Sequence, residues 1–179
     1  MKILGISGSL RRDSYNTKLL RNAPLELELW DELKAIPPYD EDDDVEPAPP
    51  AVVRMRAAVA GADAILFATP EYNASIPGQL KNAVDWLSRP QATSVLRNKP
   101  VAVVGASTGA FGAVWAQAEL RKVLATAGAR VVDGDVAVGH AHQRFDANGV
   151  LADDDLRDQF DEVAQALVAA VDMREAVAA

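Results

Sequence analysis

The alternation of short apolar runs with helix-forming stretches is the feature that most constrains how this chain can fold. Five runs read as β-strands, at residues 2–7, 25–30, 64–69, 100–106 and 130–138. Several of them are almost continuously apolar, which is typical of strands buried on both faces. Helical patterns lie between and after them, at residues 16–22, 50–60, 77–87, 113–127 and 154–172. Strands separated by helices run parallel, because each crossover returns the chain to the same edge of the sheet.

A doubly wound sheet is the arrangement that this pattern predicts. We expect a flavodoxin-like α/β fold with a five-stranded parallel sheet of order 2-1-3-4-5 and helices on both faces. The length fits a single domain over residues 1–179. The segment 31–50 is acidic and rich in proline, so we expect an exposed connection that covers no core face.

Composition excludes several classes of function. The chain has no cysteine, so disulfides, thiolate metal sites and cysteine nucleophiles are excluded, and redox chemistry must come from a bound cofactor. The net charge of −8 disfavours nucleic acids and anionic membranes as partners. No signal peptide and no apolar run of about 18 residues is visible, so a cytoplasmic protein is expected.

The segment 8–17, directly after the first strand, has the composition of a phosphate-binding loop. In doubly wound sheets ligands bind at the carboxyl ends of the strands, where the strand order reverses. The loop leads into a helix whose free N–H groups favour an anion. Its glycines match neither a dinucleotide fingerprint nor a P-loop, so a terminal phosphate monoester is expected. The predicted phosphate ligands are Ser9, Arg11, Ser14 and Asn16.

A purely structural interpretation of this loop stays open at this point. Ser14 or Asn16 would then cap the first helix, and Arg11 would be a solvated charge. We expect Arg12 and Tyr15 to face the surface or a partner.

The turn-rich segment 70–78 after the third strand offers groups that suit a planar ring. Tyr72 can lie against such a ring, and Asn73 can donate and accept hydrogen bonds at a heteroaromatic edge. Glu71 has no histidine nearby in the sequence, so we interpret it as ordering the loop or a subunit contact rather than as an acid or base.

The segment 105–113 after the fourth strand consists mostly of small residues, which allow the backbone to approach a flat ligand. Its N–H groups can stabilise negative charge, although a plain strand-to-helix turn would look the same. His140 and His142 lack a third ligand, so no metal site is predicted.

Three collinear motifs resemble the NADPH-dependent FMN reductase family of quinone, chromate and azo-compound reductases. They are Gly-Ser-Leu-Arg-x-x-Ser-x-Asn at 8–16, Pro-Glu-Tyr-Asn-x-Ser-x-Pro-Gly-x-Leu-Lys-Asn-Ala-x-Asp-Trp at 70–86, and Lys-Pro-Val-Ala-Val-Val-Gly-Ala-Ser at 99–107. The second motif is long and specific. The segment Ala113-Val114-Trp115 departs from many relatives, which continue with glycine and a polar or basic residue.

The resemblance implies non-covalent FMN, with its phosphate on Ser9, Arg11, Ser14 and Asn16. It implies that the ring lies against Pro70, Glu71, Tyr72 and Asn73, with further contacts from Ser107 and Gly109. FMN is expected rather than FAD, because the loop offers no second phosphate site.

The implied reaction passes hydride from NADPH or NADH through FMN to a small acceptor, which is a quinone, free flavin, azo compound or metal oxyanion. A ping-pong cycle needs no side chain as acid or base in its first half, so no catalytic residue is named. Two alternatives are an electron carrier of flavodoxin type and a scaffold without flavin. Arg11 argues against the carrier, since flavodoxin loops hold phosphate mainly through hydroxyls and amides.

The resemblance also implies a homodimer or homotetramer with the flavin near a subunit interface. Trp86 either extends the apolar stripe of its helix or points away from the core. In the second case we expect it to anchor a homodimer whose contact orders Glu71 and Tyr72.

Overall fold

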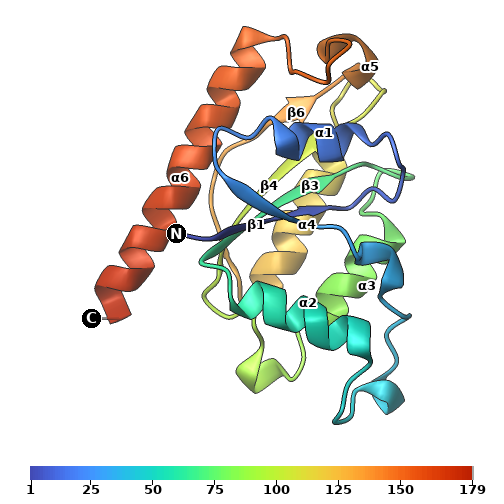
Figure 1. Cartoon of the computed structure of the whole chain (residues 1–179), viewed down its shortest axis with the longest axis vertical. Coiled ribbons are helices and arrows are strands. Elements are labelled where there is room, and N and C mark those ends of the chain that lie inside the picture. The colour runs from blue at the N-terminus through green and yellow to red at the C-terminus, as the bar shows by residue number, and fades with distance from the viewer. Residues whose placement is uncertain (179) are drawn as a thin grey trace.

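A parallel β-sheet organises the computed structural model of this protein, which describes residues 1–178 (Figure 1). The strands are β1 (Ile3–Ser7), β2 (Leu27–Trp30), β3 (Ala64–Thr69), β4 (Pro100–Ala106), β5 (Arg130–Val131) and β6 (Ala137–Val138). Their order is β2-β1-β3-β4-β5, and β6 also pairs with β4. All these pairs are parallel, so the predicted flavodoxin-like order 2-1-3-4-5 is confirmed.

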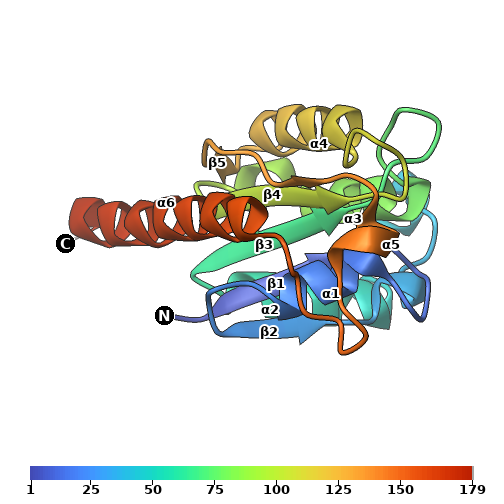
Figure 2. The same ribbon diagram turned by 90° about the horizontal axis from the view of Figure 1, so that it is seen from above.

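Helices cover both faces of the sheet (Figure 2). Helices α2, α3 and α4 pack on one face, and α1 and α6 pack on the other. In Figure 2 the strands follow one another from β2 to β5, with α1 and α6 in front of them. The bounds are α1 (Tyr15–Arg21), α2 (Pro50–Ala60), α3 (Gly78–Leu87), α4 (Val114–Thr126), α5 (Ala141–Arg144) and α6 (Asp154–Ala178), with 3-10 turns at Leu33–Ala35, Glu41–Asp43 and Gln91–Thr93.

Within residues 1–178, no helix combines the length and the apolar character that a bilayer span requires.

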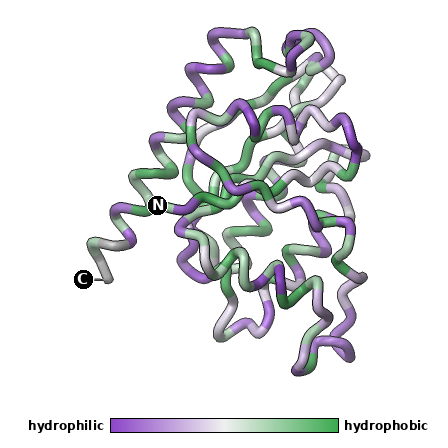
Figure 3. The backbone as a smooth tube through the Cα atoms, in the orientation of Figure 1, coloured by the Kyte–Doolittle hydropathy of each residue, from purple (hydrophilic) through white to green (hydrophobic). Residues whose placement is uncertain are grey.

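Strand β3 shows how one apolar run serves two cores. All of its residues are buried. Because side chains alternate across a strand, Ile65 and Phe67 join the core beneath α2, α3 and α4, whereas Leu66 and Ala68 face α1 and α6. Figure 3 shows hydrophobic residues gathered along the central strands. Helices on both sides therefore account for the absence of an alternating pattern.

The fifth strand, predicted as continuous over 130–138, is divided into β5 and β6. Between them Gly134 has a φ of 120°, which lies outside the strand region. The Arg121 guanidinium of α4 donates to the Gly134 carbonyl and pairs with Asp135, so the interruption is held against α4. The prediction of one unbroken strand is wrong because this side-chain anchor replaces ladder hydrogen bonds.

The connection at 31–50 is less exposed than its composition predicts. Leu33, Ile36 and Ala48 are buried in the core beside α2 and α3. The indole Nε1 of Trp86 donates to the Pro37 carbonyl at 2.9 Å and holds the segment in place. The acidic stretch 40–46 is mostly exposed. The prediction is therefore wrong for the two ends of the connection, where single apolar residues insert between α2 and α3.

Candidate functional site

A cleft opens at the carboxyl edge of the sheet, where the loops after β1, β3 and β4 meet. Seven of the ten residues predicted for the site line this cleft: Ser9, Arg11, Asn16, Pro70, Glu71, Tyr72 and Ser107. Tyr15, Ala106 and Thr108 complete the lining. The remaining predicted residues, Ser14, Asn73 and Gly109, belong to the same loops but are not part of the lining. Folding thus brings together residues that lie up to 99 positions apart, from Ser9 to Thr108.

Ser14 is the N-cap of α1. It is buried, and its Oγ accepts a hydrogen bond from the Thr17 N–H at 3.2 Å. The capping interpretation of Ser14 thus describes what the structure shows. A hydroxyl that accepts a bond keeps its own proton for donation, so the contact from Ser14 to a phosphate stays a prediction.

Asn16 joins the start of α1 to the end of β4. Its Nδ2 donates to the Ala106 carbonyl, and its Oδ1 accepts from the Ala106 N–H, both at 2.9 Å. The side chain is buried, so both bonds are protected from water. This reciprocal pair fixes the distance between the β1 loop and the β4 loop, and it leaves one amide hydrogen for a ligand.

Arg11 is the cation of the cleft. Its side chain is exposed, and no carboxylate within residues 1–178 lies at ion-pair distance from it. Ser9 lies beside it, half-buried, in the same wall. A guanidinium without a partner and an adjacent hydroxyl together suit a phosphate dianion.

The β3 loop forms a tight turn. Tyr72 and Ser75 exchange two backbone hydrogen bonds of 3.1 Å, and between them Asn73 and Ala74 have φ values of 54° and 59°. Two successive residues with positive φ characterise a type I′ turn, which Asn tolerates well. Asn73 therefore occupies the exposed tip of the turn, and its contact with a ring stays a prediction.

Two carboxylates brace the β3 loop against α4. Glu71 Oε2 accepts from the N–H groups of Trp115 and Ala116 at 3.1 Å, so the loop caps the first turn of α4. In the opposite direction, Glu119 Oε2 accepts from Ser75 Oγ at 2.6 Å and from the Ile76 N–H. The side chain of Glu71 orders the loop, as its sequence context predicts.

The β4 loop is supported by the segment between β6 and α5. Ser107 Oγ accepts from the Gly109 N–H at 3.1 Å, so this amide is engaged within the loop. The N–H of His140 donates to the Gly109 carbonyl at 2.9 Å. At Gly139 an added Cβ would lie 2.1 Å from the Ala110 oxygen, so only glycine allows this close contact.

Sequence reasoning misses three residues of the site. Tyr15 was expected at the surface, but it is half-buried, lines the cleft and stacks on Phe145 with ring centroids 5.8 Å apart. Thr108 lines the cleft beside Ser107. The buried Gln117 donates to the carbonyls of Gly112 and Val136 and so secures the β4 loop from below. A polar residue on the core side of a predicted helix is the signal that could have identified Gln117.

Trp86 does not point away from the core. Its side chain is 0% exposed, and it packs edge-to-face against Tyr39. The possibility that Trp86 anchors a subunit interface is therefore wrong, because the indole is buried in the core and its N–H is bonded to the 31–50 connection.

The fold and the cleft together define a class of protein. A doubly wound sheet presents, at its topological switch point, an unpaired guanidinium, hydroxyls and a wall of Pro70 and Tyr72. These groups fit a ligand that combines a phosphate with a planar ring, as FMN does. The class is that of flavodoxin-like flavin-binding proteins.

Comparison with known proteins gives the family. The model of the NADPH-dependent FMN reductase family matches residues 1–143. An NAD(P)H-dependent FMN reductase from Pseudomonas aeruginosa is 44% identical over 174 residues, which cover 93% of each chain. A 2-hydroxy-1,4-benzoquinone reductase from a Burkholderia species is 39% identical over 163 residues, 88% of each chain. The flavoenzyme NAD(P)H:(acceptor) oxidoreductase of Paracoccus denitrificans superposes with a TM-score of 0.80 at 32% identity, covering 93% of this chain and 96% of its own.

The chain belongs to the NADPH-dependent FMN reductase family. It is an FMN-dependent oxidoreductase that takes electrons from a reduced nicotinamide, and the resemblance carried by the three motifs is confirmed. These relatives favour the enzyme over the electron carrier of flavodoxin type.

Proposed function

We propose that this protein is a single-domain, cytoplasmic quinone reductase that works by a ping-pong cycle. The observation that carries the proposal is Arg11, an exposed cation without a carboxylate partner within residues 1–178, in a cleft that Pro70 and Tyr72 also line. When bound, FMN supplies the redox chemistry by accepting hydride from the nicotinamide and passing two electrons to the acceptor.

The residues of the cleft divide the work of holding the cofactor. Arg11 and Ser9 bind the phosphate, with Ser14 and Asn16 at the base of the same loop. Pro70 and Tyr72 of the β3 loop and Ser107 and Thr108 of the β4 loop line the ring site. Glu71 acts as a brace, because its carboxylate already accepts two backbone hydrogen bonds.

The acceptor class follows from the open side of the cleft and from the names of the relatives. Tyr72 is 50% exposed, so one side of the cleft is open to a second planar molecule. Relatives at 39% and 41% identity are named as quinone reductases. We therefore place quinones before azo compounds or metal oxyanions as acceptors.

A homodimer remains part of the proposal, with an anchor other than Trp86. Phe111 and Trp115 are 63% and 50% exposed and meet edge-to-face with ring centroids 5.1 Å apart. Exposed aromatic pairs are frequent anchors of protein interfaces. Since the Trp115 N–H binds Glu71, a contact here would reach the brace of the β3 loop.

The cofactor and the reaction are tested on the purified protein. We expect a flavin absorption spectrum, release of FMN on denaturation, and bleaching by NADPH without oxygen followed by reoxidation with a benzoquinone. Recovery of FAD by mass spectrometry would exclude the FMN site. Reduction by NADPH without reoxidation by any quinone would remove the proposed acceptor class.

The assembly is tested separately by sedimentation at micromolar concentration. We expect the holoprotein to be a dimer and the Trp115→Glu variant to be a monomer. Trp30→Glu is not a suitable control, because Trp30 packs on the core. The exposed Val45→Glu is the matched control and should leave the dimer intact. A parent protein that is monomeric with full turnover would contradict the interface.

A further inference from the structure

A second cleft lies on the other side of the β1 loop, next to the edge strand β2. Residues of β1, the β1 loop, α1, β2 and the first 3-10 turn line it. Its apolar lining includes Leu20, Leu29 and Trp30. Four cations line it as well, namely Arg11, Arg12, Arg21 and Lys34, against a single carboxylate, Asp31. We call it the basic cleft.

The charge of the basic cleft is unusual for this protein. The chain as a whole carries a net charge of −8. Within residues 1–178, none of the four cations has a carboxylate at ion-pair distance, whereas Arg54, Arg56 and Arg144 all do. Gathering like charges without partners raises the free energy of the folded chain, and it makes the cleft attractive to anions.

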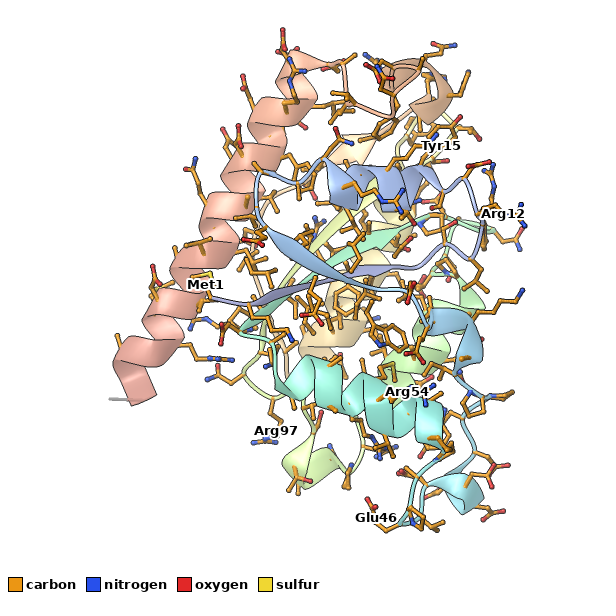
Figure 4. The ribbon with its side chains drawn as sticks, in the orientation of Figure 1. Met1, Arg12, Tyr15, Glu46, Arg54 and Arg97 are labelled. Carbon is orange, nitrogen blue, oxygen red and sulfur yellow. The ribbon has the colours of Figure 1, made fainter. Side chains whose placement is uncertain are left out.

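The basic cleft is continuous with the cleft that holds the flavin in the proposed function. Ser9 and Arg11 line both, so the two clefts share the β1 loop as a common wall. Figure 4 shows Arg12 at the outer end of this loop, and Arg12 lines the basic cleft. A ligand that extends from the flavin across the loop would place a further anionic group among Arg12, Arg21 and Lys34.

We propose that the basic cleft binds the adenosine 2′-phosphate end of NADPH, and that Arg12, Arg21 and Lys34 determine the preference for NADPH over NADH. The inference rests on the proposed function, in which a reduced nicotinamide is the electron donor. NADH lacks the 2′-phosphate, so it gains nothing from these cations beyond its pyrophosphate. The apolar side chains of Leu29 and Trp30 provide surface for the adenine.

Direct binding tests the site without any turnover. Adenosine 2′,5′-bisphosphate is titrated calorimetrically into the FMN-loaded protein and into Arg21→Glu/Lys34→Glu. We expect the double variant to bind at least about tenfold more weakly, because it replaces two charge-assisted contacts with repulsion. Arg97→Glu is the matched control, since Arg97 is an exposed, unpaired cation of a different cleft (Figure 4). Equal affinity in parent and double variant would overturn the proposal.

Two further probes separate the sources of binding. Adenosine 5′-monophosphate should bind more weakly than the bisphosphate, and inorganic phosphate more weakly still. If inorganic phosphate binds as tightly as the bisphosphate, the cleft is a general anion site and the assignment to adenosine is overturned.

Steady-state kinetics then test the discrimination. In Arg21→Glu/Lys34→Glu the KM for NADPH should rise by about 10- to 100-fold, and the KM for NADH by much less. Added salt should raise the KM for NADPH more than that for NADH in the parent, because exposed charges are screened. An equal rise for both donors overturns the proposal. A protein that is loaded with FMN but oxidises neither donor would instead refute the proposed function, while the calorimetric result would stand.

Discussion

The two edges of the sheet differ in whether their charged side chains have bonding partners. At the amino edge, Asp63 accepts from the Lys2 N–H at 2.6 Å and lies 3.8 Å from Arg174, and the buried Lys99 amine donates to the Ala62 carbonyl. At the carboxyl edge, Arg11 and Arg12 have no carboxylate partner within the part of the chain that the structure describes. The charged groups named at the amino edge hold segments of the fold together. At the carboxyl edge the carboxylates Glu71 and Glu119 do the same, whereas the two arginines of the β1 loop are left without a carboxylate within residues 1–178.

The carboxyl edge also exposes aromatic side chains. Tyr72, Phe111 and Trp115 are at least half exposed, and all three belong to loops or a helix start at the carboxyl edge. What keeps this edge ordered is a small set of internal cross-links, chiefly Asn16 with Ala106 and Glu71 with α4. Sites built in this way hold their binding groups ready at some cost in stability.

The largest effect is expected at the Asn16 cross-link. Asn16→Ala removes two buried hydrogen bonds and leaves the N–H and C=O of Ala106 unpaired, so the free energy of unfolding should fall by about 3 kcal/mol. Urea unfolding measures the loss. Asn148→Ala, at an exposed position, should change stability by less than about 0.5 kcal/mol. Similar effects for both variants would mean that the cross-link contributes nothing special.

Arg11 should affect the ligand rather than the fold. Arg11→Ala removes a charged hydrogen-bond donor from the phosphate, so FMN affinity should fall by roughly 10- to 150-fold. The urea midpoint of the Arg11→Ala apoprotein should match that of the parent, since Arg11 makes no ion pair within residues 1–178. Fluorescence titration of the apoprotein with FMN measures the affinity. If Arg12→Ala loses FMN and Arg11→Ala does not, the two arginines have been assigned in reverse.

Glu71 should couple the β3 loop to α4. Glu71→Ala leaves two N–H groups at the start of α4 without an acceptor, and we expect a loss of about 1 kcal/mol. Hydrogen exchange should quicken at the amides of Tyr72 and Ser75, whose mutual bonds close the turn. Glu162→Ala, on the exposed face of α6, is the control. Unchanged exchange in the loop would show that the brace is dispensable.

One substitution at the carboxyl edge should be stabilising. Ala74 has a φ of 59°, which an L-residue with a Cβ adopts at a cost of about 1–2 kcal/mol, so Ala74→Gly should gain about 0.5–1 kcal/mol. Ala147→Gly should be destabilising, because Ala147 is not among the residues with positive φ. Thermal unfolding compares them. If Ala74→Gly lowers the stability instead, the turn at residues 72–75 is not of type I′.

The smallest effect should appear at the amino edge, as a pH dependence. Burial lowers the pKa of the Lys99 amine; Arg174 acts in the same direction, and Asp63 opposes it. Since the native state then binds fewer protons than the unfolded state between the lowered pKa and the ordinary value near 10.4, stability should rise with pH in that window. The stability of the parent minus that of Lys99→Met, measured by urea unfolding from pH 7 to 10, should therefore increase. A constant or falling difference would contradict the lowered pKa.

The sequence by itself determines the order of the strands and the place of the site. The apolar runs of β3 and β4 require helices on both faces, and the residues that follow β1, β3 and β4 must meet at one edge of a parallel sheet. The family motifs lie in these same loops, which is why seven of the ten predicted residues line one cleft.

Only the tertiary structure decides what each polar group is bonded to. The indole N–H of Trp86 donates to the Pro37 carbonyl, and the Arg121 guanidinium donates to the Gly134 carbonyl where the last strand is interrupted. Asn16 faces Ala106, which lies 90 positions away. Such contacts join segments that are distant in the chain, so no local pattern predicts them. For the same reason only the folded structure identifies the unpaired cations of the basic cleft. Whether a cation has a carboxylate partner depends on which distant segments fold next to it, and not on the residue itself.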